Sequence, residues 1–383
     1  MPESREISPS DLRAVPEVGA LLARHGWGSL TGDGLTAFAG RNENWAGRTS
    51  AGAAVFVKRI DGVGAGERFR RASSFARLAG AGLRIPSPAC IAADEASKVM
   101  VFDFLEGALN GSDLARDGLF TEAMARGAGR ILGLLHTTPL PAGTGVLDES
   151  VPTWPRLSGA ALTTEEFAAC SGAQLELHGI VQGDSALVEA VAALAEASRT
   201  APGAPVHCDL RLDQFLVHEG ELYLTDWEEL RLADPARDVG AFVGEWLHRS
   251  IRGINEDGTV TAQTVVSRGI EELERRRPFL RAFWSGYRAT VDTDEDLASR
   301  AAGYAGWQLL DRVLAGSRER VRLHALDRAA IGIAGRVLRA PDAFREVLGL
   351  ATQEAPREAP REGPREGPRE GPQEQPREGR ACP

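Results

Sequence analysis

The apolar positions in the first hundred residues predict a small sheet with helices beside it. Residues 8–25 place apolar side chains at helical spacing, with Ser and Asp near the start. "LTAFAG" and "AAVFVKR", within residues 35–59, alternate as half-buried strands do. Residues 67–79 return to helical spacing, and "RIPSPACIAAD" and "KVMVFDFLEG" then predict further strands. This pattern indicates a β-rich unit of roughly 80 residues with one helix.

Beyond residue 107 the spacing of apolar positions becomes mainly helical. Helices are predicted over residues 121–136, 185–198, 239–248 and 271–288, with two more between 294 and 348. Residues 206–229, "VHCDLRLDQFLVHEGELYLTDWEE", differ because two short apolar runs flank Glu219-Gly220, which is typical of a hairpin. Together the patterns predict an α+β fold with a small β-rich N-lobe and a large helical C-lobe.

The sequence changes character after residue 353. Residues 354–379 repeat a four-residue unit of Pro, Arg, Glu and Gly or Ala, without an apolar side chain large enough to pack. Pro interrupts both helix and sheet hydrogen bonding, so we expect a disordered or extended tail, either passive or acting as a tether. The predicted domains are an N-terminal helical extension, the N-lobe, the C-lobe and this tail, over residues 1–29, 30–106, 107–350 and 351–383.

Composition and charge exclude several classes of protein. Asp and Glu outnumber Lys and Arg by 54 to 44 among 383 residues, so the chain lacks the basic excess of a nucleic-acid binder. It contains no run of about 18 apolar residues, and its N-terminus lacks a basic-then-apolar signal pattern. None of its four cysteines forms a Cys-x-x-Cys pair. We therefore expect a cytoplasmic enzyme that binds neither nucleic acid nor membranes.

The hairpin region carries the side chains that phosphoryl transfer from ATP requires. Asp209 is followed five residues later by Gln214, and Asp226 comes directly after the second apolar run. A short hairpin brings Gln214 and Asp226 toward one end, where their oxygens suit Mg²⁺. Upstream, Lys58 lies in a predicted strand of a chain that has only two lysines, which favours a phosphate contact. The alternatives are a solvated acidic hairpin and an exposed strand lysine.

"HCDLRLDQFL" and "LTDWEELRLADPARDVG" resemble the catalytic region of the aminoglycoside phosphotransferase family, relatives of the protein kinases. The family pattern is His-x-Asp, an Asn or Gln five residues later, and Asp-x-Asp/Glu on the next strand. By this resemblance Asp209 is the catalytic Asp and His207 braces its loop. Gln214, Asp226 and Glu228 would hold the metal. The likeness runs in order over residues 30–345 and implies a protein-kinase-like fold that uses ATP and Mg²⁺.

The same resemblance implies that the N-lobe binds the nucleotide. A loop rich in Gly and Asn would cover the phosphates, a strand lysine would contact them, and a hinge would lie beside adenine. The residues in these roles are Gly40, Asn42, Asn44, Lys58, Phe102 and Phe104.

Two positions depart from the family pattern. Kinases pair the strand lysine with a Glu on the following helix. Here the spacing points to Arg71 or Ala72 for that Glu, and Glu67 lies one or two turns too early. The partner of Lys58 is therefore open. Cys208 stands where small-molecule kinases commonly have Gly, a position that varies in the superfamily.

A narrower resemblance concerns the acceptor. "GRNENWAG", "VFVKR", "HCDLRLDQFL" and "LTDWEELRLADPARDVGAFVGEWLHR" are together similar to the kinase subunit of class V lanthionine synthetases, with related proteins in thioamitide pathways. The resemblance implies phosphorylation of Ser and Thr in a ribosomally made precursor peptide. A separate phosphothreonine-lyase-like protein would then eliminate the phosphate, with a cyclase as a further partner. The alternatives are a kinase for aminoglycosides or other small molecules, and a non-catalytic kinase-like scaffold.

Overall fold

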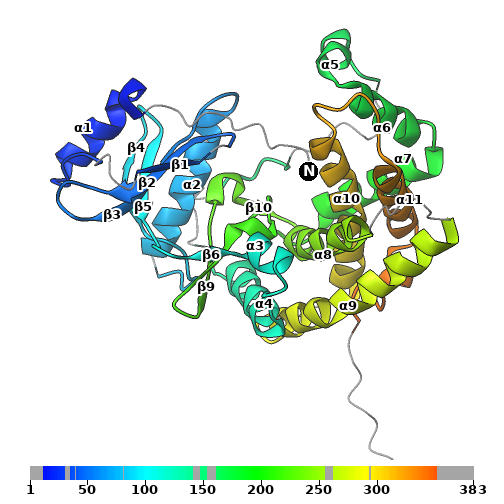
Figure 1. Cartoon of the computed structure of the whole chain (residues 1–383). Coiled ribbons are helices and arrows are strands. Elements are labelled where there is room, and N and C mark those ends of the chain that lie inside the picture. Colours follow the sequence, from blue (N-terminus) through cyan, green and yellow to red (C-terminus); the bar gives the residue numbers. More distant parts are fainter. Residues whose placement is uncertain are drawn as a thin grey trace, which may run out of the picture. The chain divides into compact units, whose positions relative to one another are not determined.

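The computed structural model describes most of the chain up to Ala351. The described residues are 12–30, 35–38, 40–80, 82–140, 147–152, 161–254, 262–292 and 295–351. The first of the chain's two compact units also ends at Ala351, and the predicted repeat tail beyond it lies outside the described residues. This unit has an N-lobe built on a sheet and a larger helical C-lobe, which confirms the predicted α+β fold (Figure 1).

The N-lobe sheet has five antiparallel strands in the order β1-β2-β3-β5-β4. The helices and strands of the N-lobe, in chain order, are α1 (Pro16–Arg24), β1 (Thr36–Phe38), β2 (Glu43–Arg48), β3 (Ala54–Arg59), α2 (Ala65–Gly80), β4 (Cys90–Asp94) and β5 (Val99–Asp103). The helix predicted from residue 8 begins at Pro16, after a 3₁₀ turn over Leu12–Ala14. Proline fits the first turn of a helix because its missing N–H has no partner there anyway.

Alternation along the strands decides which side chains face each helix. Val55 and Val57 of β3 pack in one cluster with α1, whereas Met100 of β5 packs in another with Phe69 of α2. Lys58 lies opposite Met100 in the β3–β5 register, and directly opposed residues share a face of the sheet. The sheet therefore presents Lys58 on the α2 side.

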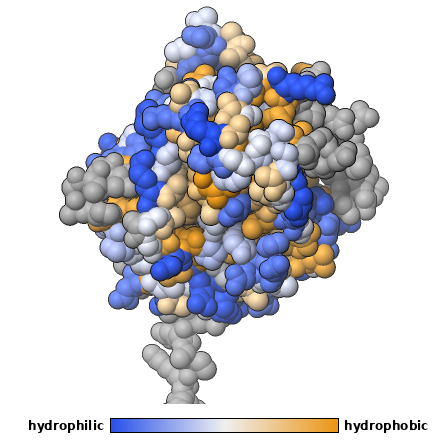
Figure 2. All heavy atoms as spheres, turned by 90° about the vertical axis from the view of Figure 1, so that its left-hand side faces the viewer, coloured by the Kyte–Doolittle hydropathy of each residue, from blue (hydrophilic) through white to orange (hydrophobic). Residues whose placement is uncertain are grey.

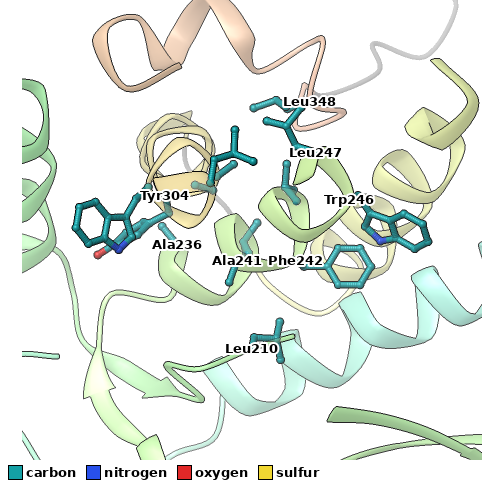
Figure 3. Packing of buried hydrophobic residues seen from close by; sticks show 14 of the residues in the cluster. Leu210, Ala236, Ala241, Phe242, Trp246, Leu247, Tyr304 and Leu348 are labelled. Atoms are coloured by element: carbon teal, nitrogen blue, oxygen red, sulfur yellow. The ribbon is translucent and has the colours of Figure 1, made fainter. Parts of the chain in front are cut away.

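The C-lobe is a set of helices packed around one apolar core. Its helices are α3 (Gly111–Arg116), α4 (Glu122–His136), α5 (Thr164–Ala169), α6 (Gly172–Gln182), α7 (Ser185–Thr200), α8 (Ala236–Arg252), α9 (Ala262–Arg288), α10 (Glu295–Gly316), α11 (Ala325–Arg339) and α12 (Pro341–Phe344). Figure 3 shows α8 contributing Phe242, Trp246 and Leu247 to this core. The Phe242 ring stacks on Phe283 of α9, with ring centroids 3.9 Å apart.

Glycines allow the central helices to approach closely. A Cβ added at Gly240 of α8 would lie 2.3 Å from the Cβ of Tyr304, on α10. A Cβ added at Gly129 of α4 would lie 2.0 Å from the carbonyl oxygen of Phe283. Real Cβ atoms cannot come this near, so a larger residue at either position would force the helices apart.

Two small sheets contain the strands that lie between α7 and α8 in sequence, together with β6. The strands β6 (Leu109–Asn110), β8 (Phe215–His218) and β9 (Glu221–Leu224) form one, and β7 (Ala204–Val206) and β10 (Arg231–Ala233) form the other. The predicted hairpin is confirmed: Glu219 and Gly220, with φ of 51° and 84°, join β8 to β9. Positive φ at both central residues is the conformation that suits a two-residue hairpin turn.

The surface of the N-lobe side mixes hydrophilic and hydrophobic residues (Figure 2). Among the described residues, no helix combines the length and the apolar character that a membrane span needs.

Candidate active site

A pocket of about 1250 Å³ lies between the N-lobe sheet and the C-lobe segment around the hairpin. Nearly all of the predicted site residues line it: Gly40, Asn42, Asn44, Lys58, Phe102, Phe104, Asp209, Gln214, Asp226 and Glu228. His207 does not line it and is fully buried behind the loop that carries Asp209. Residues from positions 40 to 228 are thus brought to one cavity.

The sheet side of the pocket is apolar and suits a flat base. Phe38, Phe56, Met100 and Phe102 line it from three strands, and the Phe38 and Phe56 rings lie 5.9 Å apart. The N–H of Phe104, in the predicted hinge, donates to the carbonyl of Ala54 at 3.3 Å. In this structure the hinge therefore offers side chains to the pocket, and the Phe104 N–H already has a partner.

Asp209 borders the same cavity, with 41% of its side chain exposed. Its Oδ2 lies 3.4 Å from Nη1 of Arg211, whose Nε donates to Asp213 at 3.2 Å. Removal from bulk water raises the pKa of Asp209 to about 6; Arg211 opposes this rise and the Asp226 carboxylate adds to it. Asp209 is ionised at neutral pH and still basic enough to accept a proton from a hydroxyl group.

The loop that carries Asp209 is held by two buried residues. His207 Nε2 donates to the carbonyl of Thr225 at 2.9 Å, which ties the loop to the strand end before Asp226. Asp238 of α8 accepts the backbone N–H groups of His207 and Cys208 at 2.8 and 2.9 Å. Asp238 belongs to the segment "ADPARDVG", which is part of the family resemblance. The sequence alone does not indicate that Asp238 binds the loop that carries Asp209.

Cys208 and Asp226 both adopt left-handed backbone conformations, with φ of 69° and 71°. This region costs about 1–3 kcal/mol for a residue with a Cβ, and glycine enters it without that cost. The departure at Cys208 therefore falls where the backbone favours the glycine that small-molecule kinases commonly have at this position. At Asp226 the turn aims the carboxylate into the pocket.

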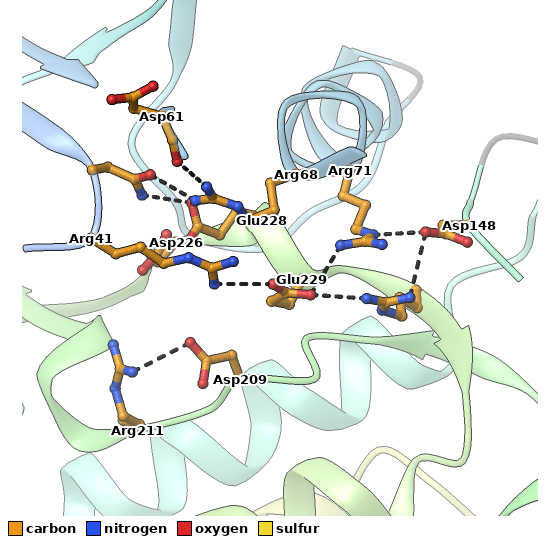
Figure 4. Close-up of polar contacts among 12 residues, drawn as sticks. Arg41, Asp61, Arg68, Arg71, Asp148, Asp209, Arg211, Asp226, Glu228 and Glu229 are labelled. Carbon is orange, nitrogen blue, oxygen red and sulfur yellow. Dashed lines mark hydrogen bonds and ion pairs between the residues drawn. The ribbon is translucent and has the colours of Figure 1, made fainter. Parts of the chain in front are cut away.

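Lys58 finds its carboxylates in the C-lobe and not on α2. Its Nζ contacts Asp226 directly and lies 3.2 Å from Oε2 of Glu228. Burial alone would lower the pKa of Lys58, but the two carboxylates outweigh it and raise the pKa above its ordinary value. Glu67, the acidic residue of α2, is exposed and lies 3.7 Å from Arg70. Figure 4 shows the surrounding charged residues, with Glu228 beside Arg68 and Glu229 beside Arg71.

Asp226 and Gln214 fit a divalent cation bound together with nucleotide phosphates. The Lys58 ammonium contacts Asp226. Burial alone would raise the pKa of Asp226, but the positive charge of Lys58 outweighs burial, and the pKa lies below its ordinary value. Gln214 Oε1 accepts the N–H of Arg211 at 2.9 Å and keeps a second lone pair. Mg²⁺ usually takes one or two protein oxygens and completes its shell with water and phosphate. Among the described residues there is no larger cluster of metal-binding side chains.

Solved structures share this fold at low sequence identity. Choline kinase LicA from Streptococcus pneumoniae is 16% identical, with a TM-score of 0.50 over 86% of this chain and 99% of its own. Amicoumacin kinase hAmiN, in complex with AMP-PNP, Ca²⁺ and Ami, is 11% identical, with a TM-score of 0.54 over 87% and 94%. A microcompartment-associated aminopropanol kinase is 13% identical, with a TM-score of 0.53 over 89% and 99%. No curated protein matches the chain significantly.

The two lobes, the pocket between them and the set of Lys58, Asp209, Gln214 and Asp226 define a kinase-like phosphotransferase. The chain belongs to the phosphotransferase enzyme family, which matches residues 34–279. It is therefore an ATP-dependent phosphotransferase, and ATP with Mg²⁺ is the phosphoryl donor of this class.

Proposed function

We propose that this kinase phosphorylates Ser and Thr side chains of a ribosomally synthesised precursor peptide. The resemblance of sequence segments between Gly40 and Arg249 to the kinase subunits of class V lanthionine synthetases supports the proposal. Asp209 would accept the proton of the acceptor hydroxyl, Asp226 and Gln214 would hold Mg²⁺, and Lys58 would contact the phosphates.

The observation that carries the proposal is the charge of the pocket lining that comes from the catalytic loop, α8, α10 and the turn after α10. The charged lining residues of these segments are Arg211, Arg237, Arg312, Arg318, Asp213 and Asp311. Arginines outnumber carboxylates four to two among these six residues, whereas the described lining as a whole holds eight carboxylates and seven lysines and arginines. A polycationic aminoglycoside would need the opposite balance, whereas a peptide backbone is neutral and tolerates this one.

Elimination of the phosphate would require a separate lyase. The chain has only two lysines, Lys58 and Lys98. Lys98 lies in the turn before β5 with φ of 55° and is not part of the pocket lining. A second lysine base is therefore lacking among the described residues of the pocket. We expect a phosphothreonine-lyase-like protein, and a cyclase after it, to act on the phosphorylated peptide.

The test incubates the protein with ATP, Mg²⁺ and a Ser- and Thr-rich candidate precursor, beside a panel of aminoglycosides, and follows the masses of all acceptors. We expect phosphorylated peptide, and loss of phosphate and water from the same residues after the lyase is added. Asp209→Asn is the control for background transfer. Transfer of phosphate to an aminoglycoside, with none to the peptide, would instead establish the alternative function, an aminoglycoside or other small-molecule phosphotransferase. The solved choline and amicoumacin kinases are small-molecule kinases by name.

A further inference from the structure

Glu228 is a shared acceptor for donors from three N-lobe elements. Its Oε2 accepts from Nδ2 of Asn42 at 2.7 Å and lies 3.2 Å from Nζ of Lys58 and 3.5 Å from Nη1 of Arg68. Asn42 directly precedes β2, Lys58 is the second-to-last residue of β3, and Arg68 lies on α2. Glu228 itself belongs to the C-lobe and is 5% exposed. One carboxylate thus joins the phosphate-covering loop, the lysine strand and the helix.

The helix α2 supplies cations where the kinase arrangement has a carboxylate. Arg68 and Arg71 lie one turn apart and are both buried. Arg71 Nη1 donates to Glu229 at 3.0 Å, and Phe75 stacks on Trp227 with ring centroids 3.7 Å apart and planes 4° from parallel. One face of α2 therefore contacts each residue of Trp227–Glu229 (η3), directly after Asp226.

We propose that Glu228 is a positioning residue that keeps Lys58 aimed at the nucleotide phosphates, with Arg68 holding Glu228 in place. The carboxylate that kinases place on the helix would here come from the opposite lobe. Lys58 has two carboxylates in this structure. If Asp226 binds Mg²⁺, Glu228 would remain as the anion that orients the ammonium.

Charge disfavours the other role, in which Glu228 holds the metal as the sequence pattern predicted. Lys58 and Arg68 bring two positive charges within 3.5 Å of its Oε2, and Asn42 occupies a further donor position. A divalent cation bound to Glu228 would lie close to both of these positive charges and would be repelled by them. Asp226, with a single cation in contact and 26% of its side chain exposed, is the better metal ligand.

The test compares Glu228→Gln with the matched variant Glu229→Gln. Glu229 is the next residue, also pairs with arginines, and does not contact Lys58. Calorimetry measures ATP binding once in EDTA and once across a Mg²⁺ titration. We expect Glu228→Gln to weaken metal-free ATP binding on the order of tenfold, because a charge-assisted contact is lost. The Mg²⁺ concentration for half-maximal effect should not change, and Glu229→Gln should leave both values near wild type.

The two lysines provide a readout that needs neither metal nor acceptor. An amine-reactive reagent labels Lys58 and Lys98, and peptide mass spectrometry gives the ratio of their rates within one molecule. Lys58, with a side chain only 12% exposed between two carboxylates, should label slowly in wild type. Its rate relative to Lys98 should rise several-fold in Glu228→Gln. Because no acceptor is present, the result is independent of the peptide assignment.

The opposite pattern would overturn the proposal. If Glu228→Gln binds metal-free ATP like wild type but needs about tenfold more Mg²⁺, Glu228 is a metal ligand. If Glu228→Gln fails to fold, Arg68→Lys takes its place, since it keeps the charge and loses the second donor to Asp61. A raised Lys58 to Lys98 ratio in that variant supports the proposal, and an unchanged ratio contradicts it.

Discussion

Replacing Asp209 by Asn should separate catalysis from stability in this protein. Loss of a general base typically slows turnover about 10²–10⁴-fold, or about 3–5 kcal/mol in the barrier. Stability should move the other way. In the folded protein the pKa of Asp209 is about 6, above the ordinary Asp value of 3.8. Stability is therefore lost as the pH rises from about 4 to about 6, because the folded state holds this proton more tightly than the unfolded state does. Asn removes this cost, and the variant should melt no lower than wild type at pH 7.5.

The size of the stability gain is limited by solvent. The Asp209 side chain is 41% exposed, so screening leaves a shift of only a few degrees in Tm. The gain should disappear near pH 4, where Asp209 is protonated in the folded protein. This dependence distinguishes loss of a charge from general loosening of the loop.

The assay measures peptide phosphorylation under single-turnover conditions, with calorimetric melting at pH 4 and pH 7.5. Asp213→Asn is the control, because Asp213 pairs with the same Arg211 and is exposed. It should retain turnover within about threefold. If Asp209→Asn also stays within about threefold of wild type, Asp209 takes no part in the chemistry. If it melts lower at pH 7.5 than at pH 4 relative to wild type, the charge argument is wrong.

The other predictions concern the metal, the lysine and the tail. Asp226→Ala should abolish the thermal stabilisation that Mg²⁺ and ATP give, and Gln214→Ala should reduce it less, because an amide brings no charge; full stabilisation of Asp226→Ala by MgATP would contradict the metal assignment. Lys58→Arg should lower ATP-dependent turnover on the order of tenfold despite retained charge, since a guanidinium is larger and planar. Unchanged KM and kcat in this variant would show that Lys58 does not contact the phosphates. Truncation after Leu350 should change Tm by less than about one degree, because the repeats lack large apolar side chains; a fall of several degrees would show that the tail packs.

Strongly periodic helices of this fold were predictable from sequence, whereas short or weakly periodic ones were not. The long helix α9 begins at Ala262, nine residues before its predicted start at residue 271. The apolar spacing in α4 and α7 gave their positions within two residues, and Glu219-Gly220 gave the hairpin. The helices α5 and α6, which start at Thr164 and Gly172, were not predicted. Each is short, and about two or three turns of helix produce little periodic signal.

The chemistry of the site was predictable where one short segment carries it, and not where distant segments meet. The spacing of Asp209, Gln214 and Asp226 predicted that they share one cavity. The partners of Lys58 were left open because Asp226 lies 168 residues away in sequence, and nothing local marks that contact. Arg68 is likewise 160 residues from Glu228, and a buried arginine on a helix reads as a surface residue until the fold is known.

The cationic face of α2 bears on how kinase-like sequences are sorted into active and inactive members. A survey that requires a glutamate at the helix position expected to pair with the strand lysine would discard the present chain as a degenerate relative, since that position is Arg71 or Ala72 and Glu67 lies one or two turns too early. An ion pair needs one charge of each sign, and either lobe can contribute the negative one. Here the acid stands two residues after Asp226, within the stretch that any such survey already reads. Candidate inactive kinases that lack the helix acid can therefore be screened for a compensating carboxylate at that position.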